Sequence, residues 1–267
     1  MSEVQSPRRA AWTAVTREVS PSLGRCELTH LERTPIDLGM ARAQHAWYEA
    51  VLESLGCSLV RLPADPELPD SVFIEDTAIV LDEVAVLTRP GAPSRQAETA
   101  AVARALELHR PLLRLEAPAT LDGGDVLVLG RTLFVGLSSR SNPEAVDQLG
   151  RLLRPHGYAV KGVRVSGCLH LKSAVTRAGE DRLLANPAWV DPGAFGDWRV
   201  LEVDPGEPCA GNVLTVEGQV VSPDCFPRTR RRLEAAGLTV HLVDMEELQK
   251  AEGAVTCCSL VFRTRTH

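Results

Sequence analysis

The segment "TLDGGDVLVLG" (residues 120–130) joins a short polar cluster directly to an apolar, β-rich run. Four other segments have the same form: "VFIEDTAIVL" (72–81), "CLHLKSAVT" (168–176), "CAGNVLTV" (209–216) and "TCCSLVFR" (256–263). One polar marker can be chosen in each, and successive markers lie 42 to 48 residues apart: Glu75, Asp122, His170, Asn212 and Cys257. Similarity at a nearly fixed period is typical of a repeat architecture.

Helix-like stretches separate these segments at 93–109, 142–157 and 224–238. In the second stretch Asn142 is a suitable N-cap, Pro143 suits the first turn, and Gly157 ends the helix. The alternation of short strands and helices predicts a closed ring of about five α/β units with the helices outside. No linker divides the chain, so we expect a single domain over residues 1–267.

Composition limits the class of protein. The chain has 267 residues, 44% of them hydrophobic and 24% charged, which is ordinary for a soluble globular protein. A net charge of −6 argues against nucleic acid as a partner, and "RTRRR" (228–232) is interpreted as a solvated helix face. No apolar run is long enough to span a membrane, and "MSEVQSPRRAAW" (1–12) lacks a signal-peptide pattern. We therefore expect a cytoplasmic protein, either a monomer or a homodimer.

The seven cysteines are scattered along the chain, and their odd number favours free thiols in a reducing compartment. No CxxC or HExxH spacing is present, so no metal site is predicted. Cys257 and Cys258 are adjacent, and in a strand their side chains would point to opposite faces. We expect Cys257 to face the centre of the ring and Cys258 to lie in the core.

The markers supply a thiol, an imidazole and carboxylates, the groups that nucleophilic catalysis requires. A single polar residue at a loop-to-strand junction is usually without function, and a single apolar-strand cysteine is usually a small buried hydrophobe. Five such markers at regular spacing favour convergence on one central site.

The acids of "DSVFIEDTAIV" (70–80) need a separate explanation. They are either exposed in a turn before a strand or buried together around a cation, for which a planar guanidinium is the best match. Arg95 and Arg140 lie in loops and could hold a carboxylate by bidentate bonds. Together, the two groups suggest a substrate with a cation at one end and a carboxylate at the other, such as arginine.

At these residues the sequence resembles the dimethylarginine dimethylaminohydrolase family, within the superfamily of guanidino-modifying enzymes that includes arginine deiminases and amidinotransferases. The resemblance covers nearly the whole chain, through "SLGRCEL" (22–28), "DSVFIEDTAIV" (70–80), "TRPGAPSR" (88–95), "ATLDGGDVL" (119–127), "LFVGLSSRSN" (133–142), "LHLKS" (169–173) and "VTCCS" (255–259). It implies a five-bladed α/β propeller with pseudo-fivefold ββαβ repeats.

The same resemblance implies roles for individual residues. Cys257 matches the nucleophile, His170 the general acid/base, and Asp122 the residue that orients the histidine. The substrate-binding positions matched are the acids Asp70, Glu75 and Asp76, the arginines Arg95 and Arg140, Leu28 on a mobile lid, and Ala251 on the pocket wall. The implied reaction is hydrolysis of Nω-methylated arginines to citrulline and methylamine or dimethylamine through a covalent S-alkylthiouronium on Cys257.

No cofactor is implied, although a thiolate beside an imidazole could bind inhibitory Zn²⁺. Two alternatives stay open at this point. One is an arginine deiminase-like guanidine hydrolase, although arginine deiminases carry an inserted helical domain for which this chain has no room. The other is a non-catalytic propeller that binds methylarginine.

Overall fold

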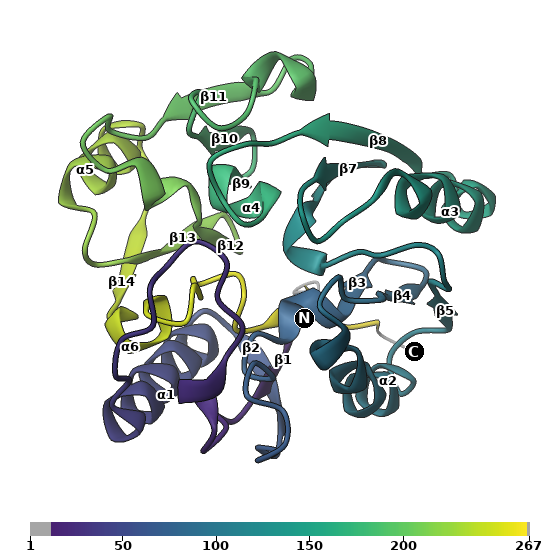
Figure 1. Cartoon of the computed structure of the whole chain (residues 1–267). Coiled ribbons are helices and arrows are strands. Elements are labelled where there is room, and N and C mark those ends of the chain that lie inside the picture. The colour runs from purple at the N-terminus through teal and green to yellow at the C-terminus, as the bar shows by residue number, and fades with distance from the viewer. Residues whose placement is uncertain (1–11, 266–267) are drawn as a thin grey trace, which may run out of the picture.

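The computed structural model describes residues 12–265. The N-terminal segment interpreted above as lacking a signal peptide lies, except for Trp12, outside this range. Five three-stranded sheets are arranged around a common centre, with the longer helices on the outside of the ring (Figure 1). The predicted α/β propeller with five blades is confirmed.

Each blade has an inner strand that is antiparallel to a middle strand, and the middle strand is parallel to an outer strand. In chain order, four blades are β3 (Ala78–Val80), β4 (Ala85–Leu87) and β5 (Leu112–Arg114); β6 (Val126–Leu129), β7 (Thr132–Leu137) and β8 (Ala159–Arg164); β9 (Val175–Arg177), β10 (Arg182–Ala185) and β11 (Arg199–Glu202); and β12 (Leu214–Val216), β13 (Gln219–Pro223) and β14 (Val240–Val243).

The remaining blade closes the ring with both ends of the described chain. Its inner strand is β15 (Leu260–Arg263), which pairs with β1 (Trp12–Arg17), and β1 pairs with β2 (Cys57–Leu62). The segment that contains Cys257 therefore occupies the same place in its blade as the other four markers do in theirs, although it comes from the far end of the chain.

Parallel pairing of the middle and outer strands requires a crossover, which a helix usually supplies. Four blades use α1 (Leu38–Ser54), α2 (Thr99–Leu106), α3 (Pro143–Leu153) or α5 (Pro227–Ala235). The predicted caps of α3 are confirmed, because the Asn142 side chain accepts a hydrogen bond from the Ala145 N–H and Gly157 adopts a left-handed φ of 76°. The blade of β9, β10 and β11 departs from the ββαβ pattern, since only a short 3-10 helix, Pro192–Phe195, links β10 to β11.

Two short helices lie outside this scheme: α4 (Leu171–Ala174) precedes the inner strand β9, and α6 (Glu246–Gln249) follows β14. On α5, Arg228, Arg231 and Arg232 are exposed, which confirms the solvated basic face. Among the described residues, no helix combines the length and apolar character that crossing a bilayer demands.

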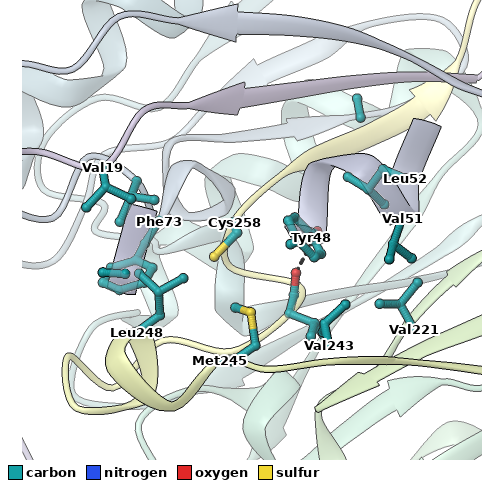
Figure 2. Close-up of a cluster of buried hydrophobic side chains, with 14 of the residues drawn as sticks. Val19, Tyr48, Val51, Leu52, Phe73, Val221, Val243, Met245, Leu248 and Cys258 are labelled. Atoms are coloured by element: carbon teal, nitrogen blue, oxygen red, sulfur yellow. Dashed lines mark hydrogen bonds between the residues drawn. The ribbon is translucent and has the colours of Figure 1, made fainter. Parts of the chain in front are cut away.

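The apolar core is divided into clusters between the sheets and their helices. One cluster packs Tyr48 and Leu52 of α1 against Phe73, Met245 and Leu248, and Cys258 lies within it (Figure 2). These fully or almost fully buried side chains fix the turn that carries Cys258 and its neighbour Cys257. The packing thereby links the outer helix to the centre of the ring.

Candidate active site

All five markers lie just before an inner strand, where the chain enters the centre of the ring. Glu75 belongs to a 3-10 turn before β3, Asp122 precedes the turn before β6, and His170 is the N-cap of α4 before β9. Asn212 and Cys257 precede β12 and β15 in the same way. The repeat therefore brings side chains from distant parts of the sequence to one centre.

His170 and Asp122 form a buried pair. His170 Nε2 lies 3.1 Å from Asp122 Oδ2, and both side chains are almost completely shielded from solvent. On the opposite edge of the imidazole, His170 Nδ1 lies 4.0 Å from Asp76 Oδ1. The imidazole is thus held between two carboxylates, as the predicted orienting role of Asp122 requires.

This environment changes the pKa of His170. Burial alone would lower it, but Asp76, Asp122 and Asp125 outweigh that effect and raise the pKa to about 9. Burial likewise opposes ionisation of Asp76, yet His170 and Arg95 lower its pKa to about 2. At neutral pH the site therefore holds an imidazolium beside ionised Asp76, a charge state suited to donating a proton.

Gly124 of "DGGD" allows His170 and Asp76 to lie close to each other. A Cβ placed on Gly124 would lie 2.6 Å from His170 Nδ1 and 2.9 Å from Asp76 Oδ1, which real Cβ atoms do not tolerate. The Gly124 N–H also donates to Asp76 Oδ1 at 2.9 Å. Gly124 is therefore required both for space and for fixing the carboxylate that faces the histidine.

Asp125, the second acid of "DGGD", was not predicted as a site residue but positions the histidine. It is fully buried, accepts hydrogen bonds from the Ser138 and Ser141 hydroxyls, and accepts the Leu171 N–H at 2.9 Å. Leu171 directly follows His170, so Asp125 fixes the backbone that carries the imidazole. Its sequence signal was its place in "DGGD", beside Asp122.

Cys257 lines the same small pocket as His170, whereas Cys258 is fully buried in the apolar cluster of Figure 2. The expectation that the two thiols point apart is confirmed, but its premise is wrong. They lie in a turn over residues 255–258, and β15 begins only at Leu260. Burial, together with Glu75 and Asp76, raises the pKa of the Cys257 thiol, so the thiol is uncharged at neutral pH.

Glu75 and Asp76, although consecutive, line different cavities. Glu75 lines a cavity of about 250 Å³ among the inner strands, where its carboxylate binds Lys172 Nζ at 2.6 Å and the Thr256 hydroxyl at 2.7 Å. Asp76 lines the pocket that contains Cys257. The predicted guanidinium-binding acids are therefore both buried, but only Asp76 is placed at the wall of that pocket.

The Arg95 guanidinium already has several hydrogen-bond partners within the chain. It binds Asp76 at 2.7 Å and Glu98 at 2.9 and 3.0 Å, and it donates to the Phe73 carbonyl at 3.1 Å. The side chain lies at the pocket wall and is 6% exposed. Arg95 therefore balances buried acids, and its carboxylate-binding role stays a prediction.

The pocket itself has a volume of about 20 Å³. All predicted site residues line it except Leu28, Glu75 and Asp122. Asp122 lies behind His170, and Leu28 packs on the apolar cluster around Tyr48. Sequence reasoning did not find four lining residues: Glu27, Phe73, Leu169 and Glu252. None of these was a repeat marker, and Phe73 and Leu169 are ordinary core residues by type.

Segment 26–33, which we call the lid loop, borders this pocket through Glu27. Asp70 accepts the Glu27 N–H at 3.1 and 3.2 Å, and Arg140 donates to the Thr29 hydroxyl at 2.9 Å. Burial raises the pKa of Asp70, although Arg95 opposes the effect. Asp70 and Arg140, both predicted to bind substrate, are thus bound to the lid loop in this structure.

One group of side chains in residues 12–265 could hold a metal ion: Asp76, Asp122 and His170 have candidate ligand atoms within 4.8 Å of one another. All three are already engaged, Asp76 with Arg95 and Gly124, and His170 with Asp122. The raised pKa of His170 also opposes the neutral imidazole that metal ligation needs. The group is better matched to proton transfer than to metal binding.

The centre of the propeller holds a thiol, an imidazolium and buried carboxylates. Among known proteins, residues 64–193 match the family model for arginine deiminase.

Curated dimethylarginine dimethylaminohydrolases are similar over most of the chain. The Streptomyces coelicolor enzyme is 39% identical over 94% of this chain and 96% of its own length. The Pseudomonas aeruginosa enzyme is 35% identical over 85% of this chain and 90% of its own length.

A solved structure of the Pseudomonas aeruginosa enzyme, a cysteine-to-serine mutant complexed with citrulline, superposes with a TM-score of 0.90 at 32% identity. The superposition covers 94% of this chain and 100% of the Pseudomonas aeruginosa chain. The chain belongs to the dimethylarginine dimethylaminohydrolase family.

Proposed function

We propose that this chain hydrolyses Nω-methylated arginines, both asymmetric dimethylarginine and monomethylarginine, to citrulline and the corresponding amine. The observation that carries the proposal is the hydrogen-bonded His170–Asp122 pair in the pocket that also contains Cys257 and Asp76. The family membership and the citrulline complex of a similar enzyme support the same reaction.

In this proposal, the substrate guanidinium binds against Asp76, with Glu75 adding negative charge from the adjacent cavity. Arg140 holds the substrate carboxylate and Asp70 its amino group. Arg140 is the better carboxylate ligand of the two predicted arginines, because its one side-chain hydrogen bond within the described residues is to the Thr29 hydroxyl. Ala251 and Leu28 contribute apolar surface at the pocket wall and under the lid loop.

Substrate binding activates the nucleophile. In the empty site, the acids that raise the pKa of Cys257 also attract the guanidinium. Once bound, the cation offsets that negative charge and favours the thiolate next to it. The thiol thus loses its proton to solvent when its target is in place, which limits reaction with other electrophiles.

The reaction then proceeds in two half-reactions. The Cys257 thiolate attacks Cζ, a C–S bond forms, and the C–N bond to the methylated nitrogen breaks as His170 donates its proton to the leaving amine. This leaves an S-alkylthiouronium on Cys257 and a neutral imidazole. His170 next takes one proton from water, whose oxygen attacks Cζ. The C–S bond then breaks to release citrulline, and the second proton of that water passes to the Cys257 sulfur, which restores the thiol.

These steps require no metal or organic cofactor. We also propose that residues 1–267 act as one catalytic domain, since all five blades contribute a residue just before their inner strands. The small-molecule substrate is an arginine derivative, and we propose a cytoplasmic location, where the scattered cysteines would stay reduced.

The test is a substrate panel. The protein is incubated separately with asymmetric dimethylarginine, monomethylarginine and arginine, and citrulline is quantified. We expect a higher kcat/KM for the two methylated substrates. A preference for arginine would instead support a deiminase, and absence of citrulline with all three would contradict a hydrolase.

A further inference from the structure

Glu252 lies at the boundary between the pocket and the lid loop, and no role has so far been assigned to it. Its carboxylate accepts three consecutive backbone N–H groups of the lid loop: Thr29 at 3.0 and 3.1 Å, His30 at 2.5 Å and Leu31 at 2.7 Å. Consecutive N–H groups that converge on one anion form a strong, directional binding site.

The backbone at Glu252 is unusual. Its φ is +59°, a left-handed conformation that glycine adopts without strain and glutamate rarely adopts. The next residue, Gly253, packs so closely on Phe73 that a Cβ there would lie 2.2 Å from the ring. Glycine would adopt this φ without strain. A glutamate at this position therefore indicates that the carboxylate itself is needed.

The other attachments of the lid loop are shared with the substrate. Asp70 and Arg140 bind Glu27 and Thr29 of the loop, and both are proposed above to bind the substrate backbone. Glu252 has no such second task. It is therefore the attachment that can remain in place when substrate draws Asp70 and Arg140 away.

With the loop attached, the pocket of about 20 Å³ holds little more than one water molecule. An arginine derivative does not fit in this volume, and the pocket is bordered both by Glu27 of the lid loop and by Glu252, which binds residues 29–31. Their side chains are exposed, so the protection of these amides rests on the carboxylate rather than on burial.

We propose that Glu252 is the latch of the lid loop: its carboxylate holds residues 29–31 closed over the pocket and sets how often the pocket opens. The substrate-related part of this inference rests on the proposed function. Glu252 is a positioning residue, since it acts through the loop and takes no part in bond making or breaking.

The test uses Glu252→Gly, which removes the carboxylate and relieves the backbone. We expect hydrogen exchange at the amides of residues 29–31 to accelerate by roughly tenfold or more, the equivalent of one hydrogen bond to a charged group. Alkylation of Cys257 by iodoacetamide, followed by mass spectrometry of its peptide, should accelerate with it. Both measurements use the substrate-free protein, so they stand even if the proposed function fails.

Two variants complete the design. Glu252→Gln keeps one oxygen acceptor without the charge, and we expect intermediate exchange. Glu217→Gly is the matched control, because Glu217 is the other non-glycine residue with positive φ among residues 12–265, in the turn between β12 and β13. It should leave exchange in the lid loop and alkylation of Cys257 unchanged.

In turnover, Glu252→Gly should raise KM more than it lowers kcat, since the closed complex is weakened while Cys257 and His170 are intact. If the amides of residues 29–31 in Glu252→Gly exchanged at the wild-type rate, the latch would be overturned. Faster exchange there without faster alkylation of Cys257 would overturn its gating role. A lowered melting temperature with faster exchange across all blades would assign Glu252 to general structure instead.

Discussion

The floor and the lid of the pocket are built in opposite ways. The floor includes His170, which is 5% exposed and is backed by Asp122 at 0%, and it is fixed by buried hydrogen bonds and close glycine contacts. The lid loop is largely exposed and is held by side chains that reach over from Asp70, Arg140 and Glu252. Chemistry requires fixed geometry, whereas entry requires an element of low local stability.

Adjacent Cys257 and Cys258 show the same division on a smaller scale. The first faces the pocket and the second is fully buried against Tyr48 and Met245. The first prediction therefore concerns the largest expected effect. Cys257→Ser should abolish citrulline formation, with a loss of roughly 10³-fold or more in kcat, because the hydroxyl is a far weaker nucleophile.

Cys258→Ala is the matched control for this substitution. It removes a buried sulfur and should lower stability by about 1 kcal/mol while leaving kcat within a few-fold of wild type. Citrulline assays and thermal melts of both variants measure the contrast. Equal losses of activity in the two variants would mean that the thiols are not functionally distinct.

The second prediction concerns the buried pair in the floor. Asp122→Asn removes the negative charge next to His170 Nε2 while keeping the shape of the side chain. The imidazole should therefore lose both its orientation and part of the increase in its pKa. We expect kcat to fall by about 10²-fold or more. The basic limb of the pH–rate profile should also move to lower pH. An unchanged profile would argue against Asp122 as the orienting group.

The third prediction uses the close contact at Gly124. Gly124→Ala would place a methyl group 2.6 Å from His170 Nδ1, so the imidazole must move, and kcat should fall by roughly 10²-fold, as expected for a displacement of about 1 Å. In the control, Gly150→Ala in α3, the new Cβ would lie 3.9 Å from Val160, an ordinary van der Waals distance. That variant should keep full activity and gain about 0.5–1 kcal/mol of stability. Similar kcat values in both variants would remove the steric argument.

The fourth prediction is the smallest and concerns stability. The folded pKa of His170 is about 9, above its ordinary value of 6.5. Its contribution is therefore fully present below pH 6.5 and is lost as pH rises through 9. Urea unfolding of the wild type should show a decrease of up to a few kcal/mol across this window, and His170→Gln should flatten it. Parallel curves for the two proteins would contradict a raised pKa.

Much of the fold follows from the sequence, because the five polar-then-apolar segments recur at regular spacing and each begins an inner strand. The crossover from β10 to β11 did not follow, since Pro192–Phe195 forms a 3-10 helix where the other blades have an α-helix. Closure of the ring by β1 and β15 also depends on a pairing between distant segments that no local pattern specifies.

The candidate site was predictable where residue type and position coincide, as for Cys257, His170 and Asp122. It was not predictable where a side chain finds its partner only in three dimensions. Arg95 is an ordinary loop arginine in the sequence, yet it is buried between Asp76 and Glu98. The role proposed for Glu252 likewise follows only from its φ and from its hydrogen bonds to the backbone of the lid loop.

The central claim is that Cys257 forms the covalent intermediate. Its most direct test is acid quenching of the protein during turnover of asymmetric dimethylarginine, followed by mass spectrometry of the peptides. We expect a substrate-derived adduct on Cys257 and none in Cys257→Ser. An adduct on Cys258 or Cys168, or citrulline formation by Cys257→Ser at the wild-type rate, would contradict it.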